Sequence, residues 1–346
     1  MKHLFAILLT LFSFYASGYA QKPFKVVFYN LENFFDLEND PDVLDDEFTP
    51  EGPKKWTKDK YDKKLSNIEK VFFDIAAINK DYPAVIGVCE IENRNVLEDI
   101  VATKKLSPAN YRIVHYDSPE LRGVDAAFMY RPDVLKLEGS KAIRTVIPSL
   151  PDFKTRDIVT MWGKIDQEDF FFMVAHWPSR LGGKEASAFR RIAVGNQMRH
   201  IADSVRALRP STKVVMMGDF NDDPTDESIS GEKGIGAKIK VKEVTPAEYY
   251  APFAALLKAG YGTLAYGDAW NIFDNIVVSG NLINEDKDQL KLKKADNSKF
   301  YGHIFKRHYM VQKEGQFKGY PLRTYVGNNF QGGFSDHFPV YIYIGK

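Results

Sequence analysis

The segment Lys213-Val-Val-Met-Met-Gly-Asp-Phe-Asn221 joins an apolar run to an abrupt polar end. The run from Val214 to Met217 has the length and the side chains of a buried β-strand. An ionised aspartate that directly follows such a run needs a partner or a function, because an unpaired buried charge is costly. We therefore expect Asp219 and Asn221 to lie at the end of a strand and to face a polar cleft.

The same pattern recurs along the chain. Short apolar runs rich in β-branched and aromatic residues predict further strands at Phe24–Tyr29, Ala84–Cys89, Tyr111–His115, Asp125–Tyr130, Ile158–Ile165, Phe170–Ala175, Phe273–Val278 and Val340–Ile344. Several of these runs end in, or are preceded by, a residue that can bind a metal or transfer a proton. Because strand ends often converge on one crevice, we expect these polar residues to form a single site.

Helical periodicity is confined to a few segments. Apolar residues at spacings of three and four predict one helix through Leu65–Ala76 and another through Val194–Leu208. A third helix is predicted at Ala247–Ala259, ended by Gly260. Strands outnumber helices and many follow one another directly, which favours mixed sheets packed together with helices outside. No Pro/Ser-rich linker interrupts residues 21–346, so we expect one domain.

The composition excludes some classes of protein. The chain has 346 residues, 44% hydrophobic and 27% charged, as in an ordinary globular protein. Its net charge of +1 provides no overall basic field, so any contact with nucleic acid must come from a local patch. Cys89 is the single cysteine, which excludes an internal disulfide, and its apolar surroundings predict a buried strand residue.

The first twenty residues have the features of a secretory signal peptide. A short polar start at Lys2 and His3 precedes the apolar run Leu4–Tyr15, and Gly18-Tyr19-Ala20 supplies small residues before Gln21. The alternative is a buried N-terminal helix. The signal predicts export to the periplasm or the outside of the cell. No second long apolar run follows, so we expect no stable membrane insertion.

The polar residues at the strand ends predict a particular chemistry. Glu90, Asp219 and Asp336 are hard oxygen donors and Asn30 offers a neutral oxygen, a set that suits Mg²⁺, Mn²⁺ or Ca²⁺ better than Zn²⁺. Histidines titrate near neutral pH and can transfer protons, as His176 and His337 would here. Taken alone, a strand-end Asp is usually a turn residue and a lone His is usually structural. The interpretation depends on the combination of these residues and on their order along the chain.

Six ordered motifs make the pattern more specific. They are Asn30-Leu-Glu-Asn33, Val88-Cys-Glu90, His176-Trp-Pro178, Gly218-Asp-Phe-Asn221, Trp270 with Asp274-Asn-Ile276, and Ser335-Asp-His337. In this order the chain, over about Lys25 to Ile344, resembles the endonuclease/exonuclease/phosphatase family, which includes deoxyribonucleases, abasic-site endonucleases, inositol-polyphosphate phosphatases and neutral sphingomyelinases. The resemblance implies a four-layer α/β sandwich, with two mixed sheets packed face to face and helices outside.

The resemblance also implies the roles of individual residues. Glu90 is the principal metal ligand, Asn30 supports the metal shell, and Asp336 lies beside it. Catalytic roles fall to His176, Asp219, Asn221, Asp274 and His337, with Asp274 as the partner of His337. The implied cofactor is Mg²⁺, or Mn²⁺ or Ca²⁺.

The chain departs from the family pattern at two places. The second acidic residue near the first motif has no clean match, and both Glu32 and Asp36 remain open. The segment Asp274-Asn275-Ile276 keeps the aspartate but differs at its neighbour. Arg180 and Arg323 lie in segments that resemble cleft-lining loops, where a guanidinium can bind a phosphate through two hydrogen bonds.

Three functions are open on the sequence. The first is an exported, metal-dependent nuclease acting on DNA or RNA, which the basic and aromatic stretch Tyr301–Tyr325 favours. The second is a phosphatase or phosphodiesterase acting on a sugar, inositol or lipid phosphate. The third is an inactive binding module, which the complete set of chemical residues disfavours. No protein partner is implied.

Overall fold

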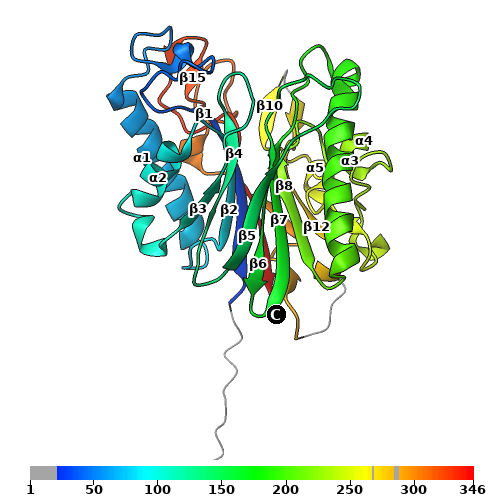
Figure 1. Cartoon of the computed structure of the whole chain (residues 1–346). Coiled ribbons are helices and arrows are strands. Elements are labelled where there is room, and N and C mark those ends of the chain that lie inside the picture. Colours follow the sequence, from blue (N-terminus) through cyan, green and yellow to red (C-terminus); the bar gives the residue numbers. More distant parts are fainter. Residues whose placement is uncertain (1–21, 267–268, 284–287) are drawn as a thin grey trace, which may run out of the picture.

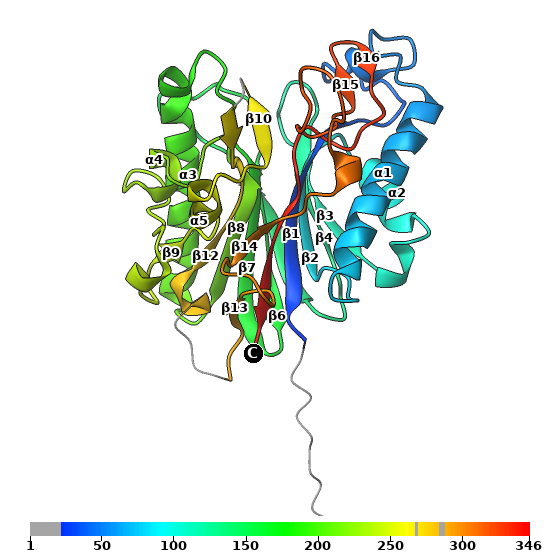
Figure 2. The same ribbon diagram turned by 180° about the vertical axis from the view of Figure 1, so that it is seen from behind.

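Two β-sheets packed face to face form the centre of the molecule, and helices cover their outer faces (Figures 1 and 2). The computed structural model describes residues 22–266, 269–283 and 288–346. The predicted signal peptide lies outside the described residues. The four-layer sandwich implied by the sequence is confirmed.

The first sheet has seven strands and contains both chain ends of the domain. Its order is β13-β17-β1-β2-β4-β3, with β14 also paired to β17. Only the β1–β2 pair is parallel, and the remaining pairs are antiparallel. The strands are β1 (Phe24–Phe34), β2 (Val85–Ile91), β3 (Arg112–His115), β4 (Asp125–Tyr130), β13 (Lys291–Lys293), β14 (Gly302–Ile304) and β17 (Val340–Gly345).

The second sheet repeats this plan with six strands. Its order is β5-β6-β7-β8-β12-β9, and β7–β8 is its parallel pair. The strands are β5 (Lys136–Ile143), β6 (Ile158–Ile165), β7 (Glu168–His176), β8 (Lys213–Asp219), β9 (Tyr249–Tyr250) and β12 (Asp274–Ser279). Two small hairpins lie outside the main sheets: β10 (Leu264–Tyr266) with β11 (Ala269–Asn271), and β15 (Tyr325–Val326) with β16 (Asn329–Phe330).

Helices flank the sheets on opposite sides of the molecule. Helices α1 (Lys58–Ala77) and α2 (Arg94–Ala102) cover the first sheet, whereas α3 (Lys184–Leu208), α4 (Glu227–Ser230) and α5 (Ala254–Lys258) lie on the side of the second (Figure 1). The first two predicted helices are confirmed by α1 and α3, although Leu208, at the end of α3, is exposed.

The predicted helix Ala247–Ala259 is wrong over its first half. Tyr249 and Tyr250 form β9, which pairs with β12, and the helix begins only at Ala254. Pro252 explains the break, because proline disfavours helical backbone in the residue before it. Gly260, with φ +83°, ends the helix as expected.

The inner faces of the two sheets meet in a continuous apolar core. Phe28, Phe128, Phe172 and Ile276 belong to this buried cluster. The sheets approach so closely that a β-carbon on Gly87 would lie 2.5 Å from the Met217 sulfur. This core fixes one sheet against the other and therefore fixes the relative positions of groups at the strand ends.

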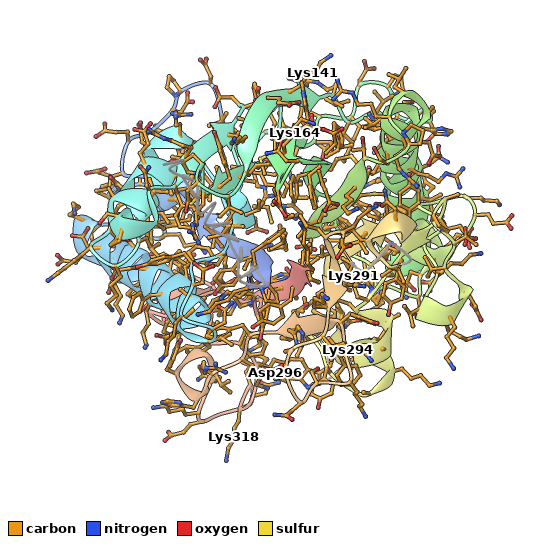
Figure 3. The ribbon with its side chains drawn as sticks, turned by 90° about the horizontal axis from the view of Figure 1, so that it is seen from below. Lys141, Lys164, Lys291, Lys294, Asp296 and Lys318 are labelled. Atoms are coloured by element: carbon orange, nitrogen blue, oxygen red, sulfur yellow. The ribbon has the colours of Figure 1, made fainter. Side chains whose placement is uncertain are left out.

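Charged side chains protect the sheet edges. Lys141 of β5 and Lys291 of β13 lie on edge strands of the two sheets. In the view from below, Lys141 appears at the rim of the molecule (Figure 3). Lysines on an edge strand oppose pairing with another chain. The pattern of β5 is mixed and half-exposed, which is why no apolar run predicted this strand.

The topology brings the polar strand ends together. Both parallel pairs, β1–β2 and β7–β8, run toward the same end of the sandwich, where β12 and β17 begin antiparallel to their neighbours. His176 lies beside Asp219 in the register, and Asp219 lies beside Asp274. The candidate residues thus converge at this end because of the strand order.

Candidate active site

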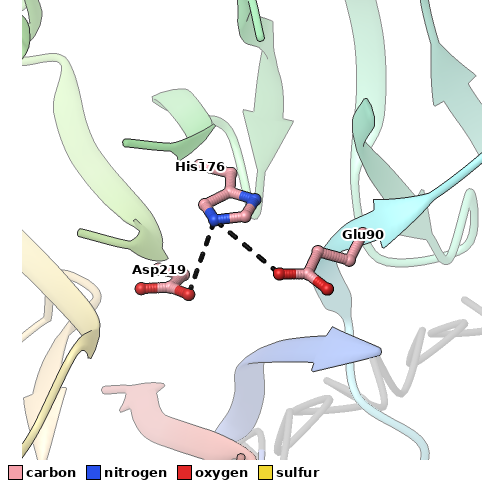
Figure 4. A group of neighbouring side chains, drawn as sticks. All are labelled: Glu90, His176 and Asp219. Atoms are coloured by element: carbon pink, nitrogen blue, oxygen red, sulfur yellow. Dashed lines mark ion pairs between the residues drawn. The ribbon is translucent and has the colours of Figure 1, made fainter. Parts of the chain in front are cut away.

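Glu90, His176 and Asp219 face one another across the gap between the sheets (Figure 4). His176 Nε2 lies 3.8 Å from Glu90 Oε1 and 3.6 Å from Asp219 Oδ2. One ligand atom from each residue lies within 4.8 Å of the others. The histidine contacts are longer than hydrogen bonds, so the imidazole and the carboxylates surround a small space.

A β-bulge aims Glu90 into this space. The register of β2 against β4 shifts between Cys89 and Ile91, and Glu90 has φ +58°. A bulge re-aims a side chain, and left-handed backbone in a non-glycine residue persists only where its surroundings hold it. Here the Asn33 amide donates to Glu90 Oε2 at 2.9 Å. The carboxylate is thus fixed before any ligand arrives.

Asn30 links the two carboxylates. Its Nδ2 donates to Glu90 Oε1 at 3.1 Å and to Asp219 Oδ2 at 3.0 Å, and its Oδ1 accepts from the Glu32 amide at 2.8 Å. The Asn30 side-chain nitrogen faces two acceptors, and its side-chain oxygen faces a backbone N–H donor. The assignment of the nitrogen and the oxygen in this side chain is therefore consistent with its hydrogen bonds. Asn30 therefore supports the candidate metal ligands by orienting them.

His337 and Asp274 form the expected pair. His337 Nδ1 lies 2.7 Å from Asp274 Oδ2, and both residues are buried. The Ser335 hydroxyl accepts from the His337 amide at 3.1 Å and donates to the Asn30 carbonyl at 2.7 Å, which ties the segment before β17 to β1. The other ring nitrogen, Nε2, is left 3.7 Å from Asp219 Oδ2. The pairing thus orients Nε2 toward the cleft.

The two histidines have opposite protonation preferences. Burial alone would lower the pKa of His337, but the carboxylates of Asp274 and Asp219 outweigh it and raise that pKa well above the usual value. Burial, followed by the charges of Arg156 and Arg122, lowers the pKa of His176 well below its usual value. At neutral pH His337 is therefore an imidazolium and His176 is a neutral imidazole. Groups whose environments separate their pKa values in this way can act as acid and base.

Asp219 lies between these histidines. Burial raises the pKa of its carboxyl to about 7, while the charge of His337 opposes that rise. The Asn221 amide donates to Asp219 Oδ1 at 2.9 Å, and Asn221 Nδ2 donates to the Trp177 carbonyl at 3.0 Å. Asn221 adopts φ +52°, which asparagine tolerates better than most residues. The turn after β8 thus fixes both Asp219 and Asn221.

Arg323 connects Asp336 to the first motif. Its Nη2 donates to Asp336 Oδ2 at 2.6 Å, and its Nε donates to Glu32 Oε1 at 3.2 Å. Asp336 Oδ1 lies 3.9 Å from His337 Nε2. Asp36, by contrast, accepts from Asn93 at 2.8 Å. Of the two acidic residues that the sequence left open, Glu32 is the one joined to Asp336.

Arg180 makes its contacts with the loop after β8 and with Phe273. Its guanidinium bonds to the Asn221 carbonyl at 2.9 Å and to Asp226 at 3.0 Å, and it lies 3.2 Å from Asp222. The same group stacks on the Phe273 ring at 4.2 Å. These contacts hold the loop after β8 in place. The phosphate-binding role of Arg180 stays a prediction.

Arg156 is a residue that the sequence interpretation missed. It is buried, its Nε has no hydrogen-bond partner among the described residues, and its Nη1 lies 3.7 Å from Glu120. Its charge acts on His176, as does that of Arg122, which reaches Asn33 Oδ1 at 3.5 Å. Arg156 precedes β6 and follows no apolar run, so the strand-end signal could not identify it.

A second group of one histidine and two carboxylates lies at the β3–β4 end. His115 Nε2 bonds to Asp125 Oδ2 at 3.0 Å, and the Ser118 amide donates to Asp125 Oδ1 at 3.0 Å. The third member, Asp117, has a side chain that is 92% exposed. Here the buried carboxylate already has its hydrogen bonds, so the group is a satisfied local pair beside a solvated aspartate.

The donor set at Glu90 fits a divalent cation. Two carboxylates and one neutral imidazole nitrogen face a common space, and the carboxylate of buried Asp219 has a raised pKa that a cation would lower. Oxygen-rich donors suit Mg²⁺ and Mn²⁺, and imidazole is tolerated. Glu90, Asp219 and His176 are therefore the residues placed to hold such an ion.

Comparison with known proteins decides the family. A model described as the Endonuclease/Exonuclease/phosphatase family matches residues 25–346. The chain belongs to this family. No curated protein matches the sequence. In the part of the chain that the structure describes, we find no helix with the length and apolar character to cross a membrane.

Solved structures share the fold. A humanised TDP2 from D. rerio is 12% identical, with a TM-score of 0.54 over 94% of this chain and 99% of that chain. A mannosyl-6-phosphatase from Bacteroides thetaiotaomicron is 15% identical, with a TM-score of 0.54 over 93% and 100%. The human Nocturnin catalytic domain is 14% identical, with a TM-score of 0.52 over 93% and 94%. At these identities the likeness concerns the fold alone.

Proposed function

We propose that this family member is an exported, divalent-metal-dependent phosphoesterase that hydrolyses phosphodiester bonds in DNA or RNA. The observation that carries the proposal is the convergence of Glu90, His176 and Asp219 beside the His337–Asp274 pair. A cation site next to an imidazolium is suited to a substrate that carries negative charge. Phosphoester hydrolysis needs such charge neutralisation together with an activated water.

Each residue has a task in this reaction. A bound cation would neutralise charge on the phosphate. Asp219 accepts a proton from the attacking water, whose oxygen forms the new bond to phosphorus as the bond to the leaving oxygen breaks. The leaving oxygen takes a proton from solvent and departs as a hydroxyl. His337 donates hydrogen bonds to a phosphoryl oxygen through Nε2, since Nδ1 is held by Asp274. Asn221 positions Asp219 through its backbone amide.

His176 and Arg156 complete the site from the second sheet. Neutral His176 offers Nε2 as a ligand or as an acceptor, while its buried Nδ1 has no hydrogen-bond partner among the described residues. Arg156 supplies a buried positive charge for a phosphoryl oxygen.

Two observations favour nucleic acid as the substrate. Basic and aromatic side chains interleave in Tyr301–Tyr325, where Lys306 lies over the Trp270 ring at 4.8 Å and Arg307 over the Phe305 ring at 4.4 Å. In addition, a structurally similar D. rerio TDP2, 13% identical with a TM-score of 0.53, was solved with a single-strand DNA product. The alternative substrate is a sugar, inositol or lipid phosphate, and the similarity to a mannosyl-6-phosphatase favours the sugar.

Metal-dependent cleavage tests the proposal. The chain from Gln21 onward is incubated with plasmid DNA and with single-stranded DNA, in EDTA and with Mg²⁺, Mn²⁺ or Ca²⁺ restored. We expect cleavage that requires a metal and disappears in Asp219→Ala. Turnover of a sugar phosphate without cleavage of either DNA would move the assignment to the alternative substrate, and no turnover of any phosphoester would overturn the proposal.

Export is tested separately. The full chain, expressed in a bacterium with a tag at its C-terminus, is expected in the periplasm or the medium with Gln21 as its first residue. A chain that keeps Met1 and stays in the cytoplasm would contradict the proposed export.

A further inference from the structure

A cavity of about 320 Å³ adjoins the candidate active site. Arg323 and Asp336 belong to its wall, and Asp336 Oδ1 lies 3.9 Å from His337 Nε2. Arg323 and Asp336 are also bonded to each other at 2.6 Å. A substrate whose phosphate contacts His337 would therefore hold the group next to that phosphate at the mouth of this cavity.

Three aromatic side chains form part of the wall. Tyr266, Phe317 and Tyr320 line the cavity, and the rings of Phe317 and Tyr320 are 5.8 Å apart. Phe317 is 47% exposed and Tyr266 is 81% exposed. Aromatic faces left in water beside a catalytic centre offer a stacking surface to any planar ring that enters.

The polar groups of the cavity are two side-chain amides, two tyrosine hydroxyls and the Arg323–Asp336 pair. Gln312 and Gln331 contribute side-chain amides, whose Nε2 atoms donate to the backbone carbonyls of Glu314 at 3.3 Å and Asn329 at 3.1 Å. A nucleobase buries two flat faces against such rings and needs hydrogen-bond partners only along its edge, which the two amides can supply.

We propose that this cavity binds a nucleobase of the substrate, adjacent to the phosphate under attack. The inference rests on the proposed phosphoesterase activity and narrows its substrate to nucleotides whose base is free to leave a stack. Bases in duplex DNA are stacked and paired, and extracting one costs free energy that a single strand does not require. Single-stranded nucleic acid and short nucleotide esters are thus the substrates that the cavity favours.

Two esters with the same leaving group test the cavity. Thymidine 5′-(p-nitrophenyl phosphate) carries a base, whereas methyl p-nitrophenyl phosphate does not, and both release p-nitrophenolate. We expect kcat/KM with Mg²⁺ or Mn²⁺ to be at least about tenfold higher for the nucleoside ester, as one base stacked on an aromatic ring contributes on this scale. A thymidine oligonucleotide should also be cleaved faster alone than when annealed to its complement.

Matched variants locate the effect. Phe317→Ala should remove most of the preference for the nucleoside ester and leave turnover of the methyl ester unchanged. Phe189→Ala is the control, because Phe189 is similarly exposed, at 41%, but lies on α3 outside this cavity. It should preserve the preference. Calorimetry with thymidine 5′-monophosphate and ribose 5-phosphate as ligands measures binding directly. Phe317→Ala should weaken binding of the nucleotide and not of the sugar phosphate.

The outcomes separate this inference from the proposed function. Metal-dependent turnover of both esters with equal kcat/KM would overturn the nucleobase site and leave the phosphoesterase standing. The nucleobase site would also be overturned if Phe317→Ala and Phe189→Ala changed the preference alike. A greater effect of Phe317→Ala on turnover of a hexose phosphate than on turnover of the nucleoside ester would overturn it as well. Failure to hydrolyse either ester would overturn the proposed function, and equal binding of the two calorimetric ligands would then also reject the nucleobase site.

Discussion

Among the described residues, two groups contain one histidine and two carboxylates, and they differ in what holds them. Glu90, His176 and Asp219 come from three strands of two sheets, and the histidine contacts of 3.6 and 3.8 Å are too long for hydrogen bonds. His115 and Asp125 come from neighbouring strands of one sheet and are bonded at 3.0 Å. Residue type and proximity alone do not distinguish them.

The difference lies in how the histidine is bonded. In the first group, Asn30, Asn33 and Asn221 hold the carboxylates. His176 is too far from either carboxylate for a hydrogen bond, and its buried Nδ1 has no hydrogen-bond partner among the described residues. In the second group, the carboxylate of Asp125 is already satisfied by His115 and Ser118. A site for chemistry keeps atoms available for a ligand, whereas a structural pair uses them internally. We expect activity to depend on the first group and stability on the second.

The largest expected effect comes from replacing His337, which lies beside the first group, and His115 of the second group in turn. His337→Ala should lower kcat/KM by about a hundredfold to a thousandfold, because one hydrogen-bond donor to the charge that develops on a reacting oxygen contributes on this scale, and should keep the fold. His115→Asn should keep activity within about twofold but lower the free energy of unfolding by about 1–3 kcal/mol, since it leaves Asp125 buried with a poorer partner.

Phosphodiester turnover and urea denaturation of both variants measure these effects. Near-parental turnover in His337→Ala would contradict the comparison. Loss of turnover in His115→Asn with an unchanged urea midpoint would also contradict it.

A smaller effect is expected from the candidate metal ligand. Glu90→Gln should reduce activity at limiting metal by about a hundredfold, since even groups that only orient a ligand change metal affinity by 10–100-fold. Excess Mn²⁺ should restore part of the loss. The measurement is activity as a function of metal concentration, and an unshifted midpoint would exclude Glu90 as a ligand.

A further prediction concerns Arg156, the buried arginine that precedes β6. Arg156→Gln should lower kcat/KM by about tenfold, as a charge-assisted hydrogen bond contributes about 1.5–3 kcal/mol. Removing this charge should also raise the pKa of His176, because Arg156 is one of the groups that lower it. Steady-state kinetics and histidine titration by NMR test the two effects. Unchanged values of both would assign Arg156 to packing alone.

The sequence predicted the fold, and it predicted that these polar residues lie together at the strand ends, because both depend on local patterns. The motif with Gly218 and Asp219 follows an apolar run, and strand order then brings it beside His176. The sequence could not predict β5, whose side chains are mixed and half-exposed, or the break at Pro252 that converts half of a predicted helix into β9. Tertiary pairing decided both of these elements.

The sequence likewise identified some of the site residues and missed others. Glu90, Asp219 and His337 were recognisable from their places at strand ends. Arg156 was not, since its importance comes from burial near His176 and not from any motif. Arg180 resembled a phosphate ligand in sequence, yet its guanidinium bonds to Asp226 and to the Asn221 carbonyl. Side-chain partners across loops are set by the folded structure and leave no periodic signal.

The smallest effect concerns a partly buried histidine, His303, which lies outside both groups. Burial lowers the pKa of His303 to about 4, and its Nε2 has no hydrogen-bond partner among the described residues. Between pH 6.5 and 4 the unfolded chain therefore binds more protons at this residue, so stability falls as the pH is lowered. His303→Phe, which keeps a ring against Tyr341, should reduce that fall by on the order of 1 kcal/mol. Urea midpoints at pH 7 and pH 4.5 measure it, and an equal fall in both proteins would contradict the assignment.

Direct metal binding tests the central claim most directly. Mn²⁺ binding is measured by calorimetry in the parent, in Glu90→Gln and in Asp117→Asn, so that each group loses one carboxylate charge. The account predicts a site in the parent that Asp117→Asn retains and Glu90→Gln loses or weakens by at least about tenfold. Equal binding in all three proteins, or loss in Asp117→Asn alone, would contradict it.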